Sequence, residues 1–323
     1  MTSLTSFKQR AKQKIKKALH WGRVYLGLQT TKEVDALYRL LYQLVHDKEQ
    51  SLDLSSAQTQ SAFASQWKDL PRGNALLSDP WFKDNVTRIL TEEEILLKPE
   101  WFKGKEVLDA GCGNGRWSYG LAKLGANITA VDVNQVALDE TKKALQEFTV
   151  RKEFIHSPLE KLSEKLHDKK FDLVFSWGVV HHCRSFNQSL HQLTQHVKEG
   201  GVFYLYLYGR ESIPYEADLA LFKERVIYNS LSTPEDKMAF LLKKSRGDMA
   251  KVHIHHDNYA PLINRRLTFD EVKSFLEGQG FTGIERTIDH SELFIRAFKG
   301  DGQQLHSSKL PKKKSPFWFE KYN

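Results

Sequence analysis

Short apolar runs recur along the middle and end of the chain, and stretches with helical spacing separate them. A short apolar run bounded by turn residues is typical of a buried strand, whereas apolar residues at three- and four-residue steps are typical of an amphipathic helix. The pattern predicts strands at residues 107–110, 126–133, 154–157, 171–177, 202–208, 282–289 and 292–298. A last helix is expected at residues 268–279, with Thr268 as its N-cap and Gly280 after its end. This alternation of strands and helices indicates an α/β fold.

The same pattern divides the chain into parts. We expect a helical extension and linker at residues 1–61, an α/β domain at residues 62–300 and a tail at residues 301–323. The extension contains an amphipathic helix at 4–27, a second helical stretch at 31–50 and a polar, Ser/Gln-rich linker at 51–61. Residues 209–266 separate the fifth strand from the last helix. This insertion should cover the carboxyl ends of the strands, where open α/β sheets bind ligands.

Three alternate glycines, Gly111, Gly113 and Gly115, follow the first apolar run and open a helical pattern. Glycines let the backbone approach a ligand closely, and the following helix offers unpaired N–H groups and the positive end of its dipole. A pyrophosphate-binding loop would have a third glycine where this chain has Ser118. Asp109, just before the loop, would also repel phosphates. A ligand that combines cationic groups with a carboxylate suits both features.

Four motifs in order resemble those of class I S-adenosylmethionine-dependent methyltransferases; they lie at residues 107–115, 126–133, 171–182 and 198–204. The resemblance extends from about Trp101 to Gly300. It implies a Rossmann-like, seven-stranded sheet with a helical N-terminal extension and a lid insertion, and S-adenosylmethionine as cofactor. The family's acidic residue that binds both ribose hydroxyls corresponds to Asp132. The cofactor residues implied are Asp109, Gly111, Cys112, Gly113, Gly115, Asp132, Val133, Ser157, Trp177 and Gly178, although the family often has Asp at the position of Ser157.

Cysteine content and hydropathy exclude several protein classes. The two cysteines, Cys112 and Cys183, support neither a disulfide framework nor a zinc or iron–sulfur centre. The chain has no apolar run of membrane-spanning length, and its first residues lack the apolar core of a signal peptide. We therefore expect a soluble, cytoplasmic protein.

Positive charge is concentrated at the two ends of the chain. The net charge is +8, of which residues 1–30 contribute +7 and residues 301–323 contribute +3, so the body carries −2. A nucleic acid is therefore a less favoured partner, because its backbone requires a basic face. The helix at 4–27 and the Lys-rich, aromatic segment at 312–319 suit an anionic membrane surface. Alternatively, the helix docks on the domain or is a mitochondrial presequence, and the segment is a loose tail.

The candidates for catalysis follow the fourth strand. His181 and His182 stand where the methyl group should point, and an imidazole that titrates near neutral pH suits proton removal from a hydroxyl. We prefer His182 as the base, in which case the rate should rise with pH through the imidazole pKa. The alternative is a packing role for both.

Further candidates surround the expected mouth of the site, and the alternative for each is ordinary packing or a polar loop. They are Gln66 and Trp67 as lid residues, Tyr208 at the end of the fifth strand, and His256, Asp257 and Tyr259 in the insertion, which could bond a polar acceptor such as a sugar. The histidines of residues 253–256 lack the spacing of a familiar zinc site, so no metal is expected.

Two absences narrow the acceptor. Residues 176–179 lack the Asn/Asp-Pro-Pro-Tyr motif by which related enzymes hold the exocyclic amine of a base, and Cys183 lacks the context of a nucleophile. The chain looks most like bacterial methyltransferases that act on small molecules, sugars, surface glycans or lipid-linked intermediates. We therefore expect O-methylation of a small-molecule or glycan acceptor. The alternatives are an RNA methyltransferase and a non-catalytic scaffold that binds S-adenosylmethionine.

Overall fold

The computed structural model describes residues 31–70, 77, 79–301 and 308–312, and the chain separates into two compact units, Met1–Leu44 and Val45–Asn323. The described part of the first unit is residues 31–44 of helix α2 (Thr31–Val45), in which Arg39 pairs with Asp35 one turn earlier. The predicted helix at 4–27 and residues 313–319 lie outside the described residues. No helix within the described ranges is long and apolar enough to cross a membrane.

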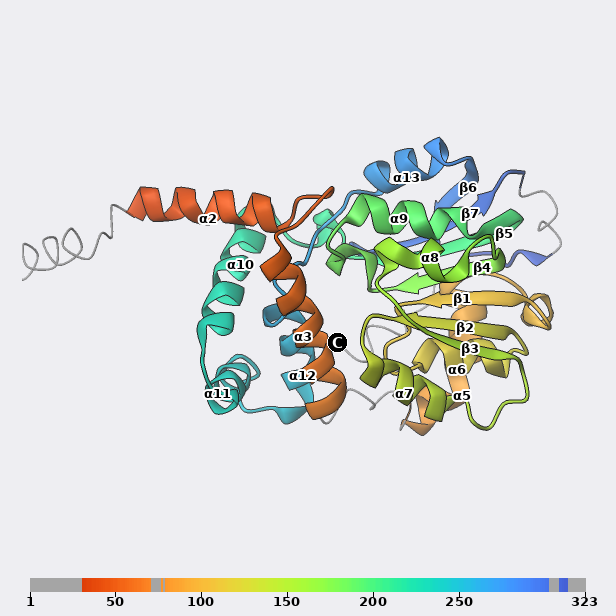
Figure 1. Cartoon of the computed structure of the whole chain (residues 1–323), viewed down its shortest axis with the longest axis horizontal. Coiled ribbons are helices and arrows are strands. Elements are labelled where there is room, and N and C mark those ends of the chain that lie inside the picture. The colour runs from red at the N-terminus through yellow and green to blue at the C-terminus, as the bar shows by residue number, and fades with distance from the viewer. Residues whose placement is uncertain (1–30, 71–76, 78, 302–307, 313–323) are drawn as a thin grey trace, which may run out of the picture. The chain divides into compact units, whose positions relative to one another are not determined.

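Seven strands form one mixed sheet in the second unit, in the order β3-β2-β1-β4-β5-β7-β6 (Figure 1). The strands are β1 (Glu106–Ala110), β2 (Asn127–Asp132), β3 (Lys152–His156), β4 (Phe171–Trp177), β5 (Val197–Leu207), β6 (Phe281–Arg286) and β7 (Leu293–Lys299). Strand β7 runs antiparallel to β5 and β6, and the other pairs are parallel. The strand order reverses between β1 and β4, which is where such sheets bind ligands. The predicted Rossmann-like α/β fold is confirmed.

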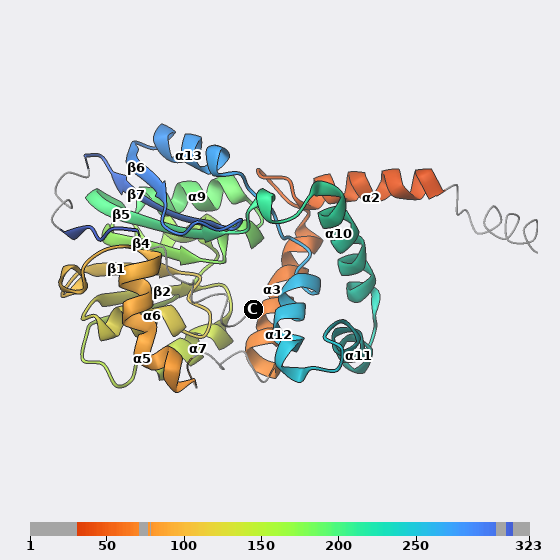
Figure 2. The ribbon, with the colours of Figure 1, turned by 180° about the vertical axis from the view of Figure 1, so that it is seen from behind.

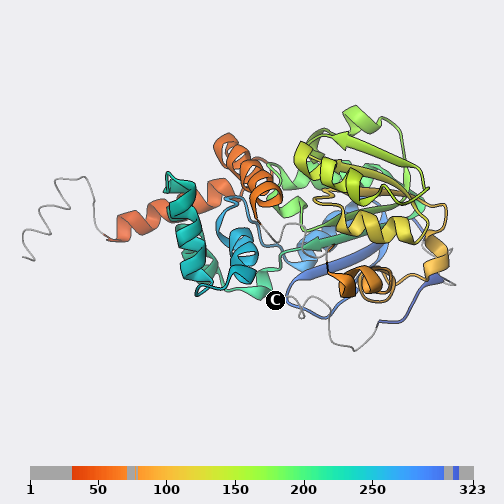
Figure 3. The same ribbon diagram turned by 90° about the horizontal axis from the view of Figure 1, so that it is seen from below.

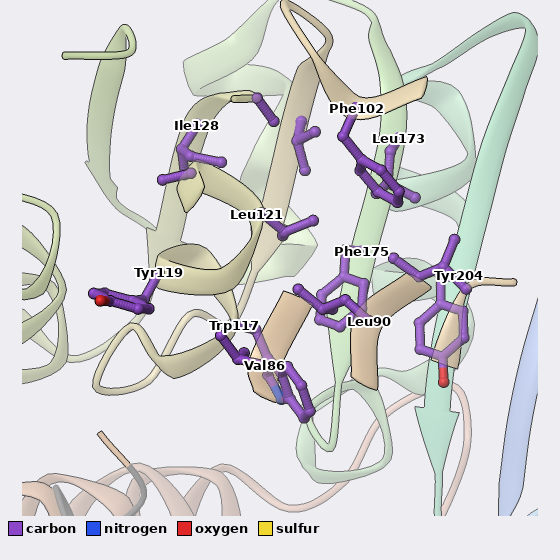
Figure 4. Packing of buried hydrophobic residues seen from close by; sticks show 14 of the residues in the cluster. Val86, Leu90, Phe102, Trp117, Tyr119, Leu121, Ile128, Leu173, Phe175 and Tyr204 are labelled. Atoms are coloured by element: carbon purple, nitrogen blue, oxygen red, sulfur yellow. The ribbon is translucent and has the colours of Figure 1, made fainter. Parts of the chain in front are cut away.

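Helices cover both faces of this sheet (Figures 1 and 2). One face carries α5 (Pro80–Ile89), α6 (Arg116–Lys123) and α7 (Gln135–Ala144), and the other α8 (Leu162–Leu166), α9 (Phe186–Gln195) and α13 (Phe269–Gly278). Neighbouring residues on β1 divide between the two cores, because successive side chains of a strand point to opposite faces: Val107 packs in the first core and Leu108 in the second. Figure 4 shows Trp117 of α6 close to Phe175 in the first core.

Short helical turns connect these elements at η1 (Leu90–Glu94), η2 (Pro99–Phe102), η3 (Leu159–Lys161), η4 (Val180–His182) and η5 (Arg210–Ser212). The predicted N-cap of the last helix is confirmed, because Thr268 and Glu271 form a reciprocal capping box.

A helical layer stands at the carboxyl ends of the strands (Figure 3). It consists of α3 (Asp53–Asp69), α10 (Tyr215–Ser230), α11 (Pro234–Lys244) and α12 (Met249–Tyr259). The last three belong to the predicted insertion between β5 and α13. The histidines of residues 253–256, for which a polar loop was one interpretation, lie on α12.

The predicted linker at residues 51–61 is wrong, because α3 begins at Asp53 and continues through it. Polar side chains of α3 form hydrogen bonds with the insertion. Gln58 donates to the carbonyl of Ala260 at 2.7 Å and accepts from the N–H of Leu262 at 2.9 Å, and Thr59 accepts from the N–H of Ile263 at 3.0 Å. The second unit accordingly begins at Val45, not at the predicted boundary after residue 61.

Arg265 connects three segments that are distant in sequence. Its buried guanidinium donates to the carbonyl of Asp47 at 2.6 Å, that of Cys183 at 2.5 Å and that of Arg184 at 2.9 Å. These bonds join the end of the insertion to the entry of α3 and to the turn that follows β4.

We predict that Arg265→Gln lowers the free energy of unfolding by about 3 kcal/mol or more, because several buried carbonyls lose charged donors. Chemical denaturation measures this change. The control is Arg151→Gln, whose exposed side chain pairs with Glu106 at the surface and should contribute less than about 1 kcal/mol. Equal effects of the two variants would contradict the role given to Arg265.

Candidate active site

The glycine loop between β1 and α6 has the backbone conformation that its sequence predicts. Gly115 is the N-cap of α6 at φ 82°, and Gly113 has φ 54°. A Cβ at Gly113 would lie 3.0 Å from the ring of Trp67, so a side chain there would crowd the α3 residue over the loop.

Asp132 ends β2 beside this loop. One carboxylate oxygen accepts from the N–H of Gly113 at 3.0 Å, and the other accepts from that of Asn134 at 2.8 Å. Burial raises the pKa of Asp132, and these backbone bonds oppose the shift. Each oxygen keeps a lone pair for a further donor, as a ribose diol would require.

Asp109 has a different environment from the one predicted. Its buried carboxylate accepts from the hydroxyl of Ser118 at 2.5 Å and does not line the cavity described below. Burial raises the pKa of Asp109 to about 7, against the lowering effect of the Ser118 bond. Because Ser118 lies in the first turn of α6, the bond from its hydroxyl to Asp109 holds the start of that helix against β1.

A cavity of about 470 Å³ opens from the glycine loop toward the helical layer. It lies at the carboxyl ends of β1, β2, β4 and β5, with α3 and α12 on its other side. Twelve of the predicted site residues line it, namely Trp67, Gly111, Cys112, Gly113, Asp132, Val133, Ser157, Trp177, Gly178, His182, Tyr208 and Asp257, together with the predicted lid residue Gln66.

The remaining predicted residues do not line the cavity; they are Asp109, Gly115, His181, His256 and Tyr259. His256 and Tyr259 occupy other faces of α12. His256 is buried, with its ring 6.5 Å from that of Tyr228, and the ring of Tyr259 is 5.4 Å from that of Phe240. Their placement does not support the predicted contact with an acceptor.

Sequence reasoning missed several residues of the cavity wall, among them Arg116, Trp117, His253 and Glu292. His253 could have been found from its spacing, because it precedes Asp257 by four residues and both face the cavity once the segment is helical. Gln66 on α3 meets both, since its amide nitrogen donates to Asp257 at 2.5 Å and lies 3.1 Å from the His253 ring nitrogen Nε2. This cluster joins α3 to α12 across the cavity.

His182 lies in the turn after β4 and has a defined tautomer. Its Nδ1 is 2.6 Å from the carbonyl oxygen of Ile263. A carbonyl can only accept, so Nδ1 carries the proton and Nε2 keeps its lone pair. Burial lowers the pKa of His182 to about 3, and Arg225, Arg265 and Arg266 act in the same direction. The imidazole is therefore neutral over the whole physiological range.

His181 is fully buried behind His182. Its ring is 4.1 Å from that of His182 and 4.1 Å from that of Tyr208, and neither ring nitrogen has a hydrogen-bond partner among the described residues. Burial holds its pKa well below the usual value. These contacts are those of a packing residue.

A comparison with protein families matches the segment that contains the glycine loop. Residues 107–201 match a family described as a methyltransferase domain. These residues thus match a methyltransferase domain, and the strand order and glycine loop agree with the class I S-adenosylmethionine-dependent methyltransferases that the sequence motifs resemble. S-adenosylmethionine is the cofactor of this class, and the glycine loop with Asp132 fits it.

Two curated relatives are ubiquinone biosynthesis O-methyltransferases. The chain is 31% identical to the mitochondrial enzyme of Schizosaccharomyces pombe over 54% of this chain and 63% of the relative, and 32% identical to that of Rickettsia canadensis over 30% and 40%. The chain thus spans less than two thirds of these relatives. A similar solved structure is magnesium protoporphyrin IX methyltransferase of Synechocystis with bound SAM, at 15% identity, TM-score 0.46, and coverage of 77% of this chain and 99% of that one.

We predict that Asp132→Asn weakens binding of S-adenosylhomocysteine at least about tenfold, because one charge-assisted bond to ribose is worth about 1.5–3 kcal/mol. Titration calorimetry measures the affinity. Asp139→Asn, at an exposed position of α7, is the matched control and should leave it unchanged. Unchanged affinity in Asp132→Asn would reject the ribose role.

Proposed function

We propose that this protein transfers a methyl group from S-adenosylmethionine to a hydroxyl of a small aromatic acceptor. The observation that carries the proposal is the continuity of one cavity, which runs from the glycine loop and Asp132 to the neutral imidazole of His182. A cofactor site and a proton acceptor thus share one space under the α3 and α12 helices.

The chain's own residues would orient the reactants and move one proton. S-adenosylmethionine supplies a methyl group that its sulfonium already activates toward a nucleophile. Asp132 and the loop amides would hold the cofactor, and Nε2 of His182 would accept the hydroxyl proton as the new bond forms. The Gln66–Asp257 bond would keep α3 and α12 closed over the cavity, which limits entry of water.

Aromatic side chains favour a flat acceptor. Trp177 stacks on Tyr206 with ring centroids 4.2 Å apart, and Tyr208 continues this wall 6.0 Å from Tyr206. The curated relatives are named for O-methylation in ubiquinone biosynthesis, which also supports a small acceptor with a hydroxyl. We therefore narrow the predicted acceptors to a small phenolic molecule, in place of a surface glycan.

Transfer of a radiolabelled methyl group into separated pools of phenols, sugars, lipids and RNA tests this function. We expect label in the phenolic pool. Label confined to the sugar or lipid pool would restore the acceptor predicted from the sequence, label confined to RNA would favour the RNA methyltransferase, and no label in any pool would favour the binding scaffold.

The buried state of His182 predicts the pH dependence. Because its pKa lies near 3, the imidazole is deprotonated throughout pH 6–8, so the rate should show no inflection near pH 6.5. This corrects the rise with pH expected from an ordinary histidine.

His182→Asn, whose amide can replace the Nδ1 donor but not the base, should lower kcat about 10²-fold. This effect is near the lower end for a general base because the imidazole is weakly basic. Steady-state kinetics measures both, with His181→Ala expected to be milder. An inflection near pH 6.5 that disappears in His182→Asn would contradict the buried neutral state.

A further inference from the structure

Arg116 is a charged residue of the cavity wall to which no role has yet been given. It is the first residue of α6, directly after the glycine loop. Its guanidinium carbon lies 4.6 Å from the ring centroid of Trp177 and 5.6 Å from that of Trp117. These two rings hold the guanidinium by cation–π contact and leave its N–H donors at the cavity.

Arg116 forms no hydrogen bond and no ion pair with any residue that the structure describes. Among acidic groups, Asp257 and Glu94 have the largest electrostatic effect on the pKa of Arg116. Neither carboxylate lies within ion-pair distance of the guanidinium. Two other arginines that line the cavity are paired through their side chains. Arg184 pairs with Asp53, and Arg266 contacts Asp218 and Glu292, each at 3.4 Å.

A guanidinium without an ion-pair partner in a mostly buried cavity wall destabilises the fold unless a ligand pairs with it. Burial lowers the pKa of Arg116, which reflects this loss of hydration. We propose that Arg116 binds a carboxylate of the methyl acceptor, an assignment that rests on the proposed function. Two parallel N–H groups of a guanidinium match the two oxygens of a carboxylate. A doubly charged group fits less well, because Asp257 and Glu94 are close and the other lining arginines are already paired.

The aromatic wall sets how such an acceptor would lie. From Arg116, the wall continues through Trp177, Tyr206 and Tyr208, whose ring is 5.6 Å from that of His182. A flat acceptor along this wall would have its carboxylate at the cation and its hydroxyl at the base. The cofactor anchor, Asp132, ends β2, whereas the groups that surround Arg116 include Tyr206 and Tyr208 of the β5 side and Asp257 of α12. This placement favours the acceptor over the cofactor as the source of the carboxylate.

Binding of two matched probes to the full chain saturated with S-adenosylhomocysteine tests the proposal. The probes are 3-(3,4-dihydroxyphenyl)propionate and 4-ethylcatechol, which differ by the carboxylate. Calorimetry gives the affinities, and a change in tryptophan fluorescence on binding that Trp177→Phe reduces indicates occupancy beside Arg116. We expect the carboxylated probe to bind at least about tenfold more tightly, Arg116→Gln to remove this difference, and Arg116→Lys to restore part of it. Arg184→Gln, a lining residue already paired, should leave the difference intact.

Equal affinity for the two probes in the wild-type protein would overturn the proposal, as would failure of the carboxylated probe to bind. A loss of S-adenosylhomocysteine affinity in Arg116→Gln with an unchanged probe ratio would also overturn it, because the guanidinium would then serve the cofactor's carboxylate. Thermal unfolding of each variant shows whether it folds. The probe measurement involves no turnover, so it tests the role of Arg116 independently of methyl transfer. Either proposal can therefore fail while the other is supported.

Discussion

The hydrogen bonds of Arg265 are the constraint on which the arrangement of the site depends. One guanidinium holds the carbonyls of the segment before α3 and of the turn after β4, and the backbone N–H of Arg265 donates to the carbonyl of His181 at 3.1 Å. Nearby in the chain, Ile263 accepts from His182. The end of the insertion thus fixes both the segment that leads into α3 and the position of the His182 imidazole. The cavity wall formed by α3 and the insertion is therefore held in a fixed position relative to the wall formed by the strand ends.

Arginines near the cavity occupy two kinds of environment. Arg265 and Arg266 are surrounded by carbonyl and carboxylate oxygens, so their charges stabilise the fold. Arg116 lies between aromatic rings, which attract a cation without satisfying its N–H donors. Only the second environment leaves guanidinium N–H donors available to a ligand.

Local patterns predicted the strands, the glycine loop, Asp132 and the capped last helix, because each depends on residues close in sequence. They failed for α3, whose Gln58 and Thr59 are polar but bond to residues some 200 positions later. The orientation of residues on α12 was missed for the same reason. The low pKa of His182 could not be predicted either, since burial and three arginines of the insertion produce it. Long-range contacts, not local propensity, determine these features.

The buried imidazoles of His181, His182 and His256 make folding itself sensitive to acid. Burial lowers the pKa of all three, whereas an unfolded chain would protonate them near pH 6.5. The unfolded state then binds more protons than the native state, so stability is complete above about pH 6.5 and falls as the pH decreases toward the native pKa values. Three such groups together contribute a slope of about 4 kcal/mol per pH unit near pH 5, against a total stability of about 5–15 kcal/mol for a typical domain. The packing that keeps His182 neutral therefore also sets a lower pH limit for the folded protein.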